Sequence, residues 1–584
     1  IAAIWSAYQI VPLLTKTLAP ETFLEKYLYA YILGGVLGGI IIGLIAIVFP
    51  ARTASRLDLT KALMEYVEEI EAKEKLSKWI IVFFIIGIYA IIEVSLGMPV
   101  MVAFIRALMS GLFFLIFLFL IFIIFEMMAI YAGPLLFAYS ASRIVAHFSS
   151  RLEKIFGKLI SPLSGMLSYI TTRSISRRKA RMARIIFLIA LTLTLGVYYS
   201  IASSTHITRQ NINTQLSIGA DIKITFYEMI TYNESINIIG NISSIDGINE
   251  VARVAELRIY TTVSYGGQEI AYNVYGVDYQ YFYMPFMKSE YLVGLSRSSA
   301  ADLVDNTTKI ILPIAAKRYY NYEIGDDVYL HVSGADKIIK TSVGGFLKFA
   351  PGFHRWGIFE LQQRYAGFCL IGIEAARELV KSVNVSEKEV ININTILIKV
   401  NSNANVSYIS QQIEEKLGDY RFSLQTYKDI LEQAKQFSFS YLVAFFTQME
   451  FIFSLLIAIS GMGLIMIVSV LERRREIALL IVKGASKKEI FGMMIGEAFI
   501  ITVLAYGLGI LVALAYAYGF LVGTLSFGAF TQEVYEFPPG YAMSIPVYLP
   551  LVLIIAFIAF LLSALIPTWY VTRRNLASEL RIHH

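Results

Sequence analysis

Seven long apolar runs constrain this chain more than any other feature. Each is about 20 residues long and nearly free of charge, which is the length that crosses a bilayer as a helix. A shorter apolar stretch, Ile1–Leu14, is expected to be the end of a helix that starts earlier or the remnant of a processed terminus. The sequence predicts an α-helical transmembrane bundle of seven full spans plus an N-terminal fragment, with one large α/β extracytoplasmic domain. The spans are Tyr29–Phe49, Trp79–Leu96, Ala107–Tyr131, Ile185–Ser203, Phe445–Leu471, Phe491–Tyr518 and Val547–Pro567.

Composition supports a membrane protein. Hydrophobic residues make up 57% of the 584 positions and charged residues 16%, whereas soluble chains have about 45–50% and about 25%. A soluble protein and a disordered protein are therefore excluded. The single cysteine, Cys369, excludes a disulfide framework, a zinc ribbon and an iron–sulfur site. We expect it to be a small buried residue.

Basic residues set the orientation, because Lys and Arg gather on the cytoplasmic side. The segment 137–184 has ten Lys/Arg and one acid, and the loop 472–490 has six Lys/Arg and three Glu. These loops, the segment 51–78 and the C-terminal tail fall on one side when the spans alternate. The plasma membrane, with the large domain outside and the C-terminus in the cytoplasm, is the predicted location.

Five parts are predicted along the chain. Residues 1–78 hold the last spans of a first unit with a cytoplasmic segment, and residues 79–136 hold two linking spans. Residues 137–203 are a basic cytoplasmic segment and a span. Residues 204–440 form the external domain, and residues 441–584 hold three C-terminal spans.

The external segment has a mixed α/β pattern. Strands are predicted at Asp221–Phe226, Thr395–Val400 and Arg421–Leu424, and a helix at Asn405–Leu417. Two hairpins are predicted, at Glu250–Tyr265 with Gln268–Val277 and at Val328–Val332 with Lys337–Val343. A helix from about Thr426 is expected to run directly into the span at Phe445.

Other features of the external segment have two interpretations. The aromatic stretch Tyr279–Phe286 is either a ligand-contacting loop or core, and core is favoured. Gly344, Gly345 and Gly352 indicate a mobile loop around Phe346–Phe349. No catalytic set or metal spacing is visible, so we predict that the chain is not an enzyme. The lone histidines His206, His331 and His354 are expected to be structural.

Five N-x-S/T sequons all lie in the predicted external domain, which fits candidate N-glycosylation sites in a glycoprotein. The same segment also holds 15 of the chain's 16 asparagines, so two or three sequons would occur there by chance. The sequons agree with the topology without establishing glycosylation. They are Asn233, Asn241, Asn306, Asn384 and Asn405.

A cytoplasmic helix–turn–helix is predicted between the spans Phe445–Leu471 and Phe491–Tyr518. Its first helix carries apolar residues (Ile477, Leu479, Leu480, Val482) on a segment already outside lipid, so that surface needs a partner. Gly484 is expected to end the helix. Ser486 and Glu489 have the S-x-x-E spacing of a capping box. The candidate coupling residues are Glu472, Arg473, Arg474, Arg475, Glu476, Gly484, Ala485, Ser486 and Glu489.

Two further patterns concern membrane contact. Arg173–Arg184 is predicted to be a basic amphipathic helix at the inner membrane surface, with Arg177, Arg178, Lys179 and Arg181 facing lipid headgroups. Phe49–Leu63 and Ile566–Leu580 match weakly at an offset of 517, which indicates an internal duplication in which Pro50 and Pro567 each end a span.

Glu126 and Glu497 are the strongest candidates for buried charge within the spans. A carboxylate at mid-bilayer costs about 2.5–3.5 kcal/mol on insertion scales. Ion or proton coupling is one interpretation, and a helix-packing or interfacial role is favoured.

The stretch LERRREIALLIVKGASKKEIFGMMIGEA (471–498) resembles the hallmark of FtsX-like permeases, in the MacB/FtsX/LolC superfamily of ABC transporters. The order span–external domain–three spans over 185–567 is similar to one whole FtsX-like unit. The layout is most similar to ten-span bacitracin-resistance-type permeases, and residues 1–63 resemble the end of an earlier unit whose start is missing.

The resemblance implies a mechanotransmission subunit that handles a lipid, lipoprotein or peptide. A cytoplasmic ABC ATPase, as a dimer, would bind ATP and Mg, while this chain holds no cofactor and no G-x-x-x-x-G-K-[ST] motif. Other expected partners are the lipid bilayer and an external substrate or adaptor protein, with no nucleic acid. The alternatives are an ATP-independent membrane receptor or scaffold and an ion-coupled secondary transporter.

Overall fold

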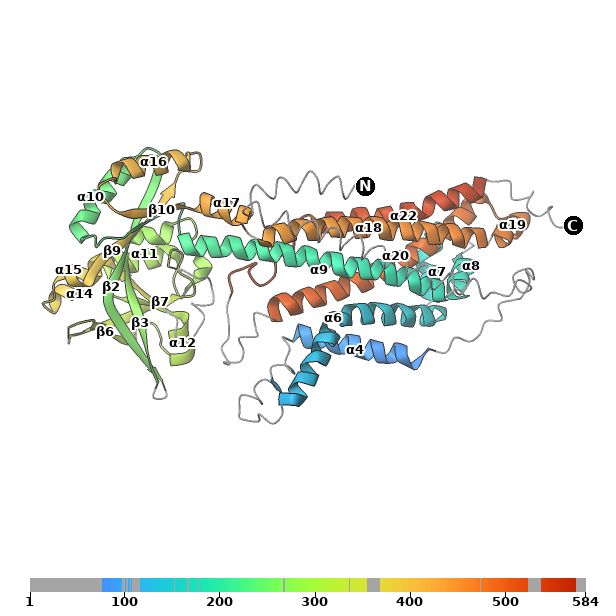
Figure 1. Ribbon diagram of the computed structural model, residues 1–584, viewed down its shortest axis with the longest axis horizontal. Helices are drawn as coiled ribbons and strands as arrows, with labels where there is room; N and C mark the ends of the chain where they lie inside the picture. Colours follow the sequence, from blue (N-terminus) through green and yellow to red (C-terminus); the bar gives the residue numbers. More distant parts are fainter. Residues whose placement is uncertain are drawn as a thin grey trace, which may run out of the picture.

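The computed structural model describes most of the chain from residue 76 onward. A sheet domain lies at one end and a helical bundle extends from it (Figure 1). The predicted span Tyr29–Phe49 lies outside the described residues. Described are residues 76–96, 100, 103–104, 107, 116–151, 153–164, 168–177, 179–265, 268–335, 337–353, 368–437, 439–472, 474–523 and 537–573.

Six long helices form the described bundle. Five of them are long and apolar enough to cross a membrane, and α22 contains a shorter apolar segment, Leu549–Leu565. A one-turn π-helix, η6 (Gly519–Gly523), follows α20. The long helices are α4 (Lys78–Ser95), α6 (Ile116–His147), α9 (Lys179–Ile218), α18 (Phe439–Glu472), α20 (Lys487–Tyr518) and α22 (Leu549–Arg573).

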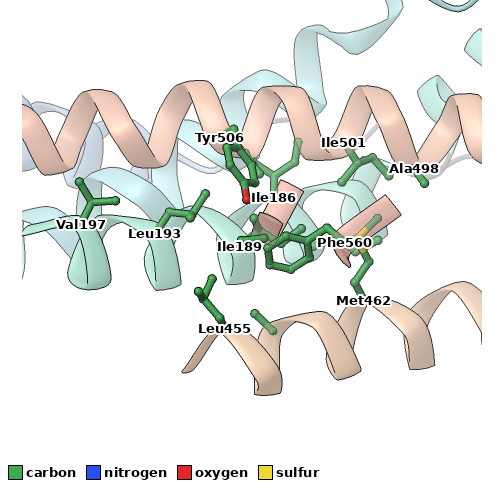
Figure 2. Close-up of a cluster of buried hydrophobic side chains, with 14 of the residues drawn as sticks. Ile186, Ile189, Leu193, Val197, Leu455, Met462, Ala498, Ile501, Tyr506 and Phe560 are labelled. Carbon is green, nitrogen blue, oxygen red and sulfur yellow. The ribbon is translucent and has the colours of Figure 1, made fainter. Parts of the chain in front are cut away.

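Helices α9 and α20 form the centre of the bundle. In the most apolar stretch of α9 and of α20, 56% and 50% of the residues are buried. The corresponding fractions are 22% for α4 and 28% for α18. Ile189 and Leu193 of α9 meet Ile501 of α20, Met462 of α18 and Phe560 of α22 in one apolar cluster (Figure 2). The outer faces of α4 and α18 stay apolar and exposed, as surfaces in contact with lipid would be.

Small residues allow the central helices to approach closely. A Cβ atom at Gly509 of α20 would lie 2.8 Å from the carbonyl oxygen of Ala190 in α9. Thr194 Oγ1 donates a hydrogen bond to the Gly509 carbonyl at 3.2 Å. Backbone contact of this kind is how membrane helices gain van der Waals packing without a hydrophobic driving force between them.

The sheet domain is a ten-stranded mixed sheet among the described residues. Its order is β10-β1-β9-β2-β3-β8-β5-β7-β4, and β6 pairs with both β2 and β7. The pairs β3–β8 and β5–β7 are parallel. The strands are β1 (Ile222–Phe226), β2 (Ile248–Tyr265), β3 (Gln268–Val277), β4 (Leu292–Val293), β5 (Ile310–Pro313), β6 (Asp327–Val332), β7 (Ile338–Leu347), β8 (Phe368–Gly372), β9 (Ile391–Val400) and β10 (Phe422–Thr426).

Helices cover the sheet through three apolar clusters. α10 and α16 cover the β1–β9 end, α12 and α14 pack near β6 and β8, and α11 lies with η4 near the end of α9. The remaining helical elements are α10 (Tyr232–Ser243), η4 (Tyr279–Tyr283), η5 (Ser289–Tyr291), α11 (Arg297–Asn306), α12 (Ile314–Tyr320), α14 (Ile373–Ser382), α15 (Glu387–Val390), α16 (Val406–Lys416) and α17 (Tyr427–Phe437).

Most predicted elements of this domain are confirmed. β1, β9, β10 and α16 occupy the predicted places, and both hairpins form, with Tyr265 opposite Gln268 in the first. Tyr281 and Phe282 are fully buried, so the core interpretation of the aromatic stretch is correct. Burial raises the pKa of the Tyr281 hydroxyl, which donates to the Pro351 carbonyl at 2.8 Å.

The mobile-loop prediction is wrong. Gly344 and Gly345 lie inside strand β7, and Phe346 and Phe349 are buried. A Cβ atom at Gly344 would collide with Leu303 of α11. The glycines therefore serve close packing of a helix on a strand instead of loop motion.

Three predictions about helix limits are also wrong. Residues 116–131 of the span placed at Ala107–Tyr131 lie in α6, which continues to His147, so the 136/137 division falls inside a helix. Pro567 does not end its helix, because α22 continues to Arg573. A proline is tolerated there because it costs one backbone hydrogen bond that membrane helices can satisfy in other ways.

Gly509→Ala should destabilise the bundle by about 1–3 kcal/mol, the usual cost of overpacking. The matched control is Gly507→Ala on the same helix, where a Cβ atom would meet nothing within 4 Å. Thermal unfolding of both variants in detergent checks this. Equal midpoints for the two variants would contradict the packing described here.

Cys369 should be a probe of sheet-domain unfolding. It is fully buried in β8, and burial raises the pKa of its thiol. A maleimide should label it on the order of 10³-fold more slowly than an exposed thiol, because labelling requires opening of the domain. The control is Ser402→Cys, at an exposed turn, in a Cys369→Ala background. Equal labelling rates would contradict the burial.

Candidate coupling site

The end of the bundle remote from the sheet domain, called the distal end, contains the predicted helix–turn–helix (Figure 1). α18 ends at Glu472, α19 (Arg474–Val482) follows, and α20 begins at Lys487. The segment is thus a short helix held between two spans, as the sequence predicts.

The turn between α19 and α20 has two locking motifs. Gly484 has φ +98°, its N–H donates to the Ile481 carbonyl at 3.0 Å, and the N–H of Ala485 donates to the Leu480 carbonyl at 2.9 Å. This pair of bonds is a Schellman motif, in which glycine supplies the left-handed residue. Ser486 then caps α20 through the predicted capping box, in which its N–H donates to Glu489 Oε2 at 2.8 Å.

Apolar residues of α19 face in two directions. Ile477 and Ala478 are buried against Val470 of α18 and Ile490 and Met493 of α20. This contact fixes the angle at which α19 leaves the bundle.

The outer face of α19 remains uncovered. Leu479 and Val482 are 53% and 71% exposed, and Glu476 beside them is exposed as well. The predicted apolar surface therefore divides into an inner half, which packs against α18 and α20, and an outer half, which stays exposed. Arg474 and Arg475 lie in the first turn of α19, and Arg473 lies outside the described residues.

Two amphipathic helices support α20 at the distal end. In α7 (Glu153–Ser164), Phe156 and Ile160 are buried, and Ile160 packs over Gly496 of α20. The next helix, α8, spans Ser168–Arg177.

Of the basic helix predicted for Arg173–Arg184, residues 173–177 are helical in α8 and residues 179–184 are helical in α9, and Arg178 between them lies outside the described residues. Lys179 and Arg181 are half-buried in the first turn of α9. α9 is long and apolar enough to cross a membrane, so these basic residues lie at the start of a long apolar helix.

α9 joins the distal end to the sheet domain without interruption. Its 40 residues correspond to a rod of about 60 Å. Ile186 and Leu193 lie in the core of the bundle, whereas Ile212 and Leu216 lie in the core of the sheet domain. α17 and α18 form the second connection, and Ser438 between them lies outside the described residues.

Arg209 of α9 ties the helix to the segments that follow α20. Its guanidinium donates to the carbonyls of Tyr541 (2.8 Å), Leu521 (2.7 Å) and Ala542 (3.1 Å). It also lies over the Tyr541 ring, 5.4 Å from the centroid. One side chain thus connects α9, the π-helix η6 and the approach to α22.

The sheet domain has a cavity of about 330 Å³ between α10, the ends of β2 and β3, and α14. Arg253 lines it and forms a two-pronged ion pair with Asp278, at 2.8 and 3.0 Å. Arg253 and Arg377 both lie over the Tyr232 ring, at 4.8 and 3.7 Å from its centroid. The ion pair of Arg253 and Asp278 was not predicted from the sequence. It makes this cavity a candidate binding site.

The predicted intramembrane acids are buried but do not lie together. Glu126 of α6 is fully buried and accepts a hydrogen bond from Tyr89 of α4 at 2.7 Å. Glu93 of α4, which is also buried, accepts from the Val100 N–H at 2.8 Å. Glu497 is buried separately in α20. Contacts of this kind join helix to helix, which is compatible with the packing interpretation.

All five sequon asparagines are exposed. Asn233 and Asn241 lie on α10, and Asn306 is the last residue of α11. Asn384 has φ 56°, and the Asn405 side chain caps α16 by accepting from the N–H groups of Ser407 and Tyr408. Each is thus sterically accessible, and glycosylation itself stays a prediction.

Comparison with protein families finds a match for the C-terminal part of the bundle. Residues 449–576 match the model of the FtsX-like permease C-terminal family. These residues form an FtsX-like permease C-terminal domain. This domain comprises most of α18, α19, α20 and α22, so it contains the turn between α19 and α20 and those residues of the Figure 2 cluster that lie on α18, α20 and α22; the α9 residues of the cluster lie outside it.

Two solved structures are similar to this chain at low identity. One is the extracellular domain of the noncanonic ABC-type transporter YknZ from Gram-positive bacteria, with 14% identity, TM-score 0.23, and coverage of 35% of this chain and 98% of that chain. The other is a domain of a protein described as a permease from Porphyromonas gingivalis, with 11% identity, TM-score 0.23, and coverage of 36% and 91%. No curated protein matches the chain.

Arg209→Met should loosen the link between α9 and the segment 538–548. Three backbone carbonyls lose a charged donor, and each lost bond of this kind costs about 1.5–3 kcal/mol. Hydrogen–deuterium exchange of residues 538–548 should rise, while exchange in the core of the sheet domain stays unchanged. His206→Ala, at an exposed position one turn earlier, is the control. Unchanged exchange in Arg209→Met would contradict the assigned role.

Proposed function

We propose that this chain is the permease, or mechanotransmission, subunit of an ABC transporter. It couples ATP hydrolysis on a separate cytoplasmic ATPase, acting as a dimer with ATP and Mg, to movement of the external domain. The cargo class is a lipid, a lipoprotein or a peptide. The observation that carries the proposal is that α9 contributes buried side chains both to the core of the bundle and to the core of the sheet domain.

The orientation is part of the proposal. The distal end carries the basic segments, so it faces the cytoplasm by the distribution of Lys and Arg. The sheet domain then lies outside, and its exposed sequon asparagines are open to modification. The FtsX-like domain and five apolar helices support a multi-pass membrane protein.

The ATPase contact is assigned to the outer half of α19. Leu479 and Val482 form an exposed apolar pair on a helix held by the Schellman motif and by its buried inner face. The basic residues Arg473, Arg474 and Arg475 lie at the start of the same segment. A motor that pulls or tilts α19 would move α18 and α20 with it, because α19 is packed against both.

The cavity around Arg253 is proposed as the place where external substrate or an adaptor protein makes contact. It lies between α10 and the ends of β2 and β3, and the largely buried ion pair of Arg253 and Asp278 sets its polarity. A receptor or scaffold without an ATPase would use the same cavity, so the ATPase test separates the two functions.

Leu479→Ser with Val482→Ser should weaken ATPase binding about tenfold or more, since exposed apolar anchors carry most interface energy. Binding is measured by co-purification of the tagged chain from native membranes, followed by titration of the purified ATPase. The permease should also change the ATPase rate in proteoliposomes. Ile338→Ser, an equally exposed apolar residue of the sheet domain, is the control.

Two further variants sharpen the result. Reversing Arg473, Arg474 and Arg475 to Glu should weaken the contact, whereas Arg421→Glu, on an exposed residue of the sheet domain, should not. Gly484→Pro should also weaken it, because proline cannot adopt φ +98°, and Gly484→Asn should retain it. Full binding in the variants, or no ATPase partner at all, would refute the proposal.

A further inference from the structure

A second cavity, of about 190 Å³, lies at the distal end where three helices begin or end. The start of α4 contributes Leu76, Ser77 and Ile80. The last turns of α6 contribute Arg143 and His147, and α9 contributes its first residue, Lys179. The three helices come from separate parts of the sequence, and their distal ends lie near one another in Figure 1.

The charge around this cavity has one sign. Arg143, His147 and Lys179 line it, and no carboxylate is among the described lining residues. Arg143 and His147 are four residues apart on α6, so they lie on the same helix face. An anion in the cavity would meet cationic groups from two different helices.

The start of α4 adds backbone donors. Ser77 is the N-cap of this 18-residue helix, its side chain makes no capping hydrogen bond, and the first turn contains no acidic residue. The first N–H groups of a helix lack acceptors in a preceding turn and carry a partial positive charge; in α4 the Ile80 N–H donates to the Ser77 carbonyl at 2.9 Å, so the donors for a ligand are those of Lys78 and Trp79. They therefore reinforce the basic side chains.

The basic residues have no ion-pair partner within the part of the chain that the structure describes. The guanidinium of Arg143 lies over the Tyr139 ring, 6.0 Å from its centroid. Two half-buried basic side chains, Arg143 and Lys179, thus converge on a hollow without a carboxylate.

Apolar surface adjoins the cavity. Leu76 and Ile80 line it, and Trp79, Ile81 and Ile85 follow on α4 with exposed side chains. Trp79 is 68% exposed, and tryptophan at the end of a span marks the level of the lipid headgroups. A ligand that fits both surfaces has an anionic head and an apolar tail.

We propose that the hollow between α4, α6 and α9 is a binding site for the phosphate group of an anionic phospholipid. Arg143, Lys179 and the N–H groups at the start of α4 hold the phosphate, and His147 donates a further hydrogen bond. The acyl chains lie along Ile81 and Ile85. The site does not depend on ATPase coupling, and it fixes the distal ends of three helices to the membrane surface.

The test uses Trp79 as a local reporter. In the full chain carrying Trp5→Phe, Trp356→Phe and Trp569→Phe, bromine-labelled phosphatidylglycerol should quench Trp79 with a relative affinity at least about fivefold above bromine-labelled phosphatidylcholine. Arg143→Gln with Lys179→Gln should bring this ratio close to one. Lys158→Gln, an exposed basic residue of α7 outside the cavity, should leave it unchanged.

Three outcomes would overturn the assignment. Equal quenching by the two lipids removes the preference for an anionic head. A preference that survives in Arg143→Gln/Lys179→Gln places the lipid elsewhere on the bundle. Displacement of phosphatidylglycerol by inorganic phosphate at matched ionic strength assigns the hollow to free phosphate. Retained quenching preference in the presence of phosphate supports the lipid.

Discussion

One helix shared by two cores is the constraint on which the rest of the structure depends. α9 contributes Ile186 and Leu193 to the bundle and Ile212 and Leu216 to the sheet domain. Because its backbone hydrogen bonds run unbroken over 40 residues, neither core can shift along or about α9 without displacing the other. Arg209 strengthens this link by holding η6 and the approach to α22 to the same helix.

The distal end complements this link. The Schellman motif at Gly484 and the capping box at Ser486 fix the turn, and Ile477 fixes α19 against α18 and α20. The outer half of α19 is then a rigid surface. A rigid surface at the distal end, together with a helix that is packed into both the bundle and the sheet domain, suits the transmission of force, which is the function proposed for this chain.

Local sequence signals predicted the elements well where one signal dominated. The capping box at Ser486, the hairpin around Tyr265 and Gln268, and helix α16 all follow from short-range chemistry. The predictions failed where packing overrode it. Gly344 and Gly345 suggested a loop, but they lie in a strand because Leu303 and Leu295 need the space.

The sequence by itself determined that the chain crosses a membrane, where its α/β domain lies, and which turn joins α19 to α20, since apolar length, strand alternation and capping are local properties. Only the tertiary structure decided which side chains meet. Counting from the hairpin turn would place Gln280 opposite Arg253, but an irregularity in the β2–β3 register brings Asp278 to it. Likewise, Arg143 and Lys179 reach one cavity only because the end of α6 lies beside the start of α9. Such contacts depend on helix packing and strand register, which are set by the whole fold.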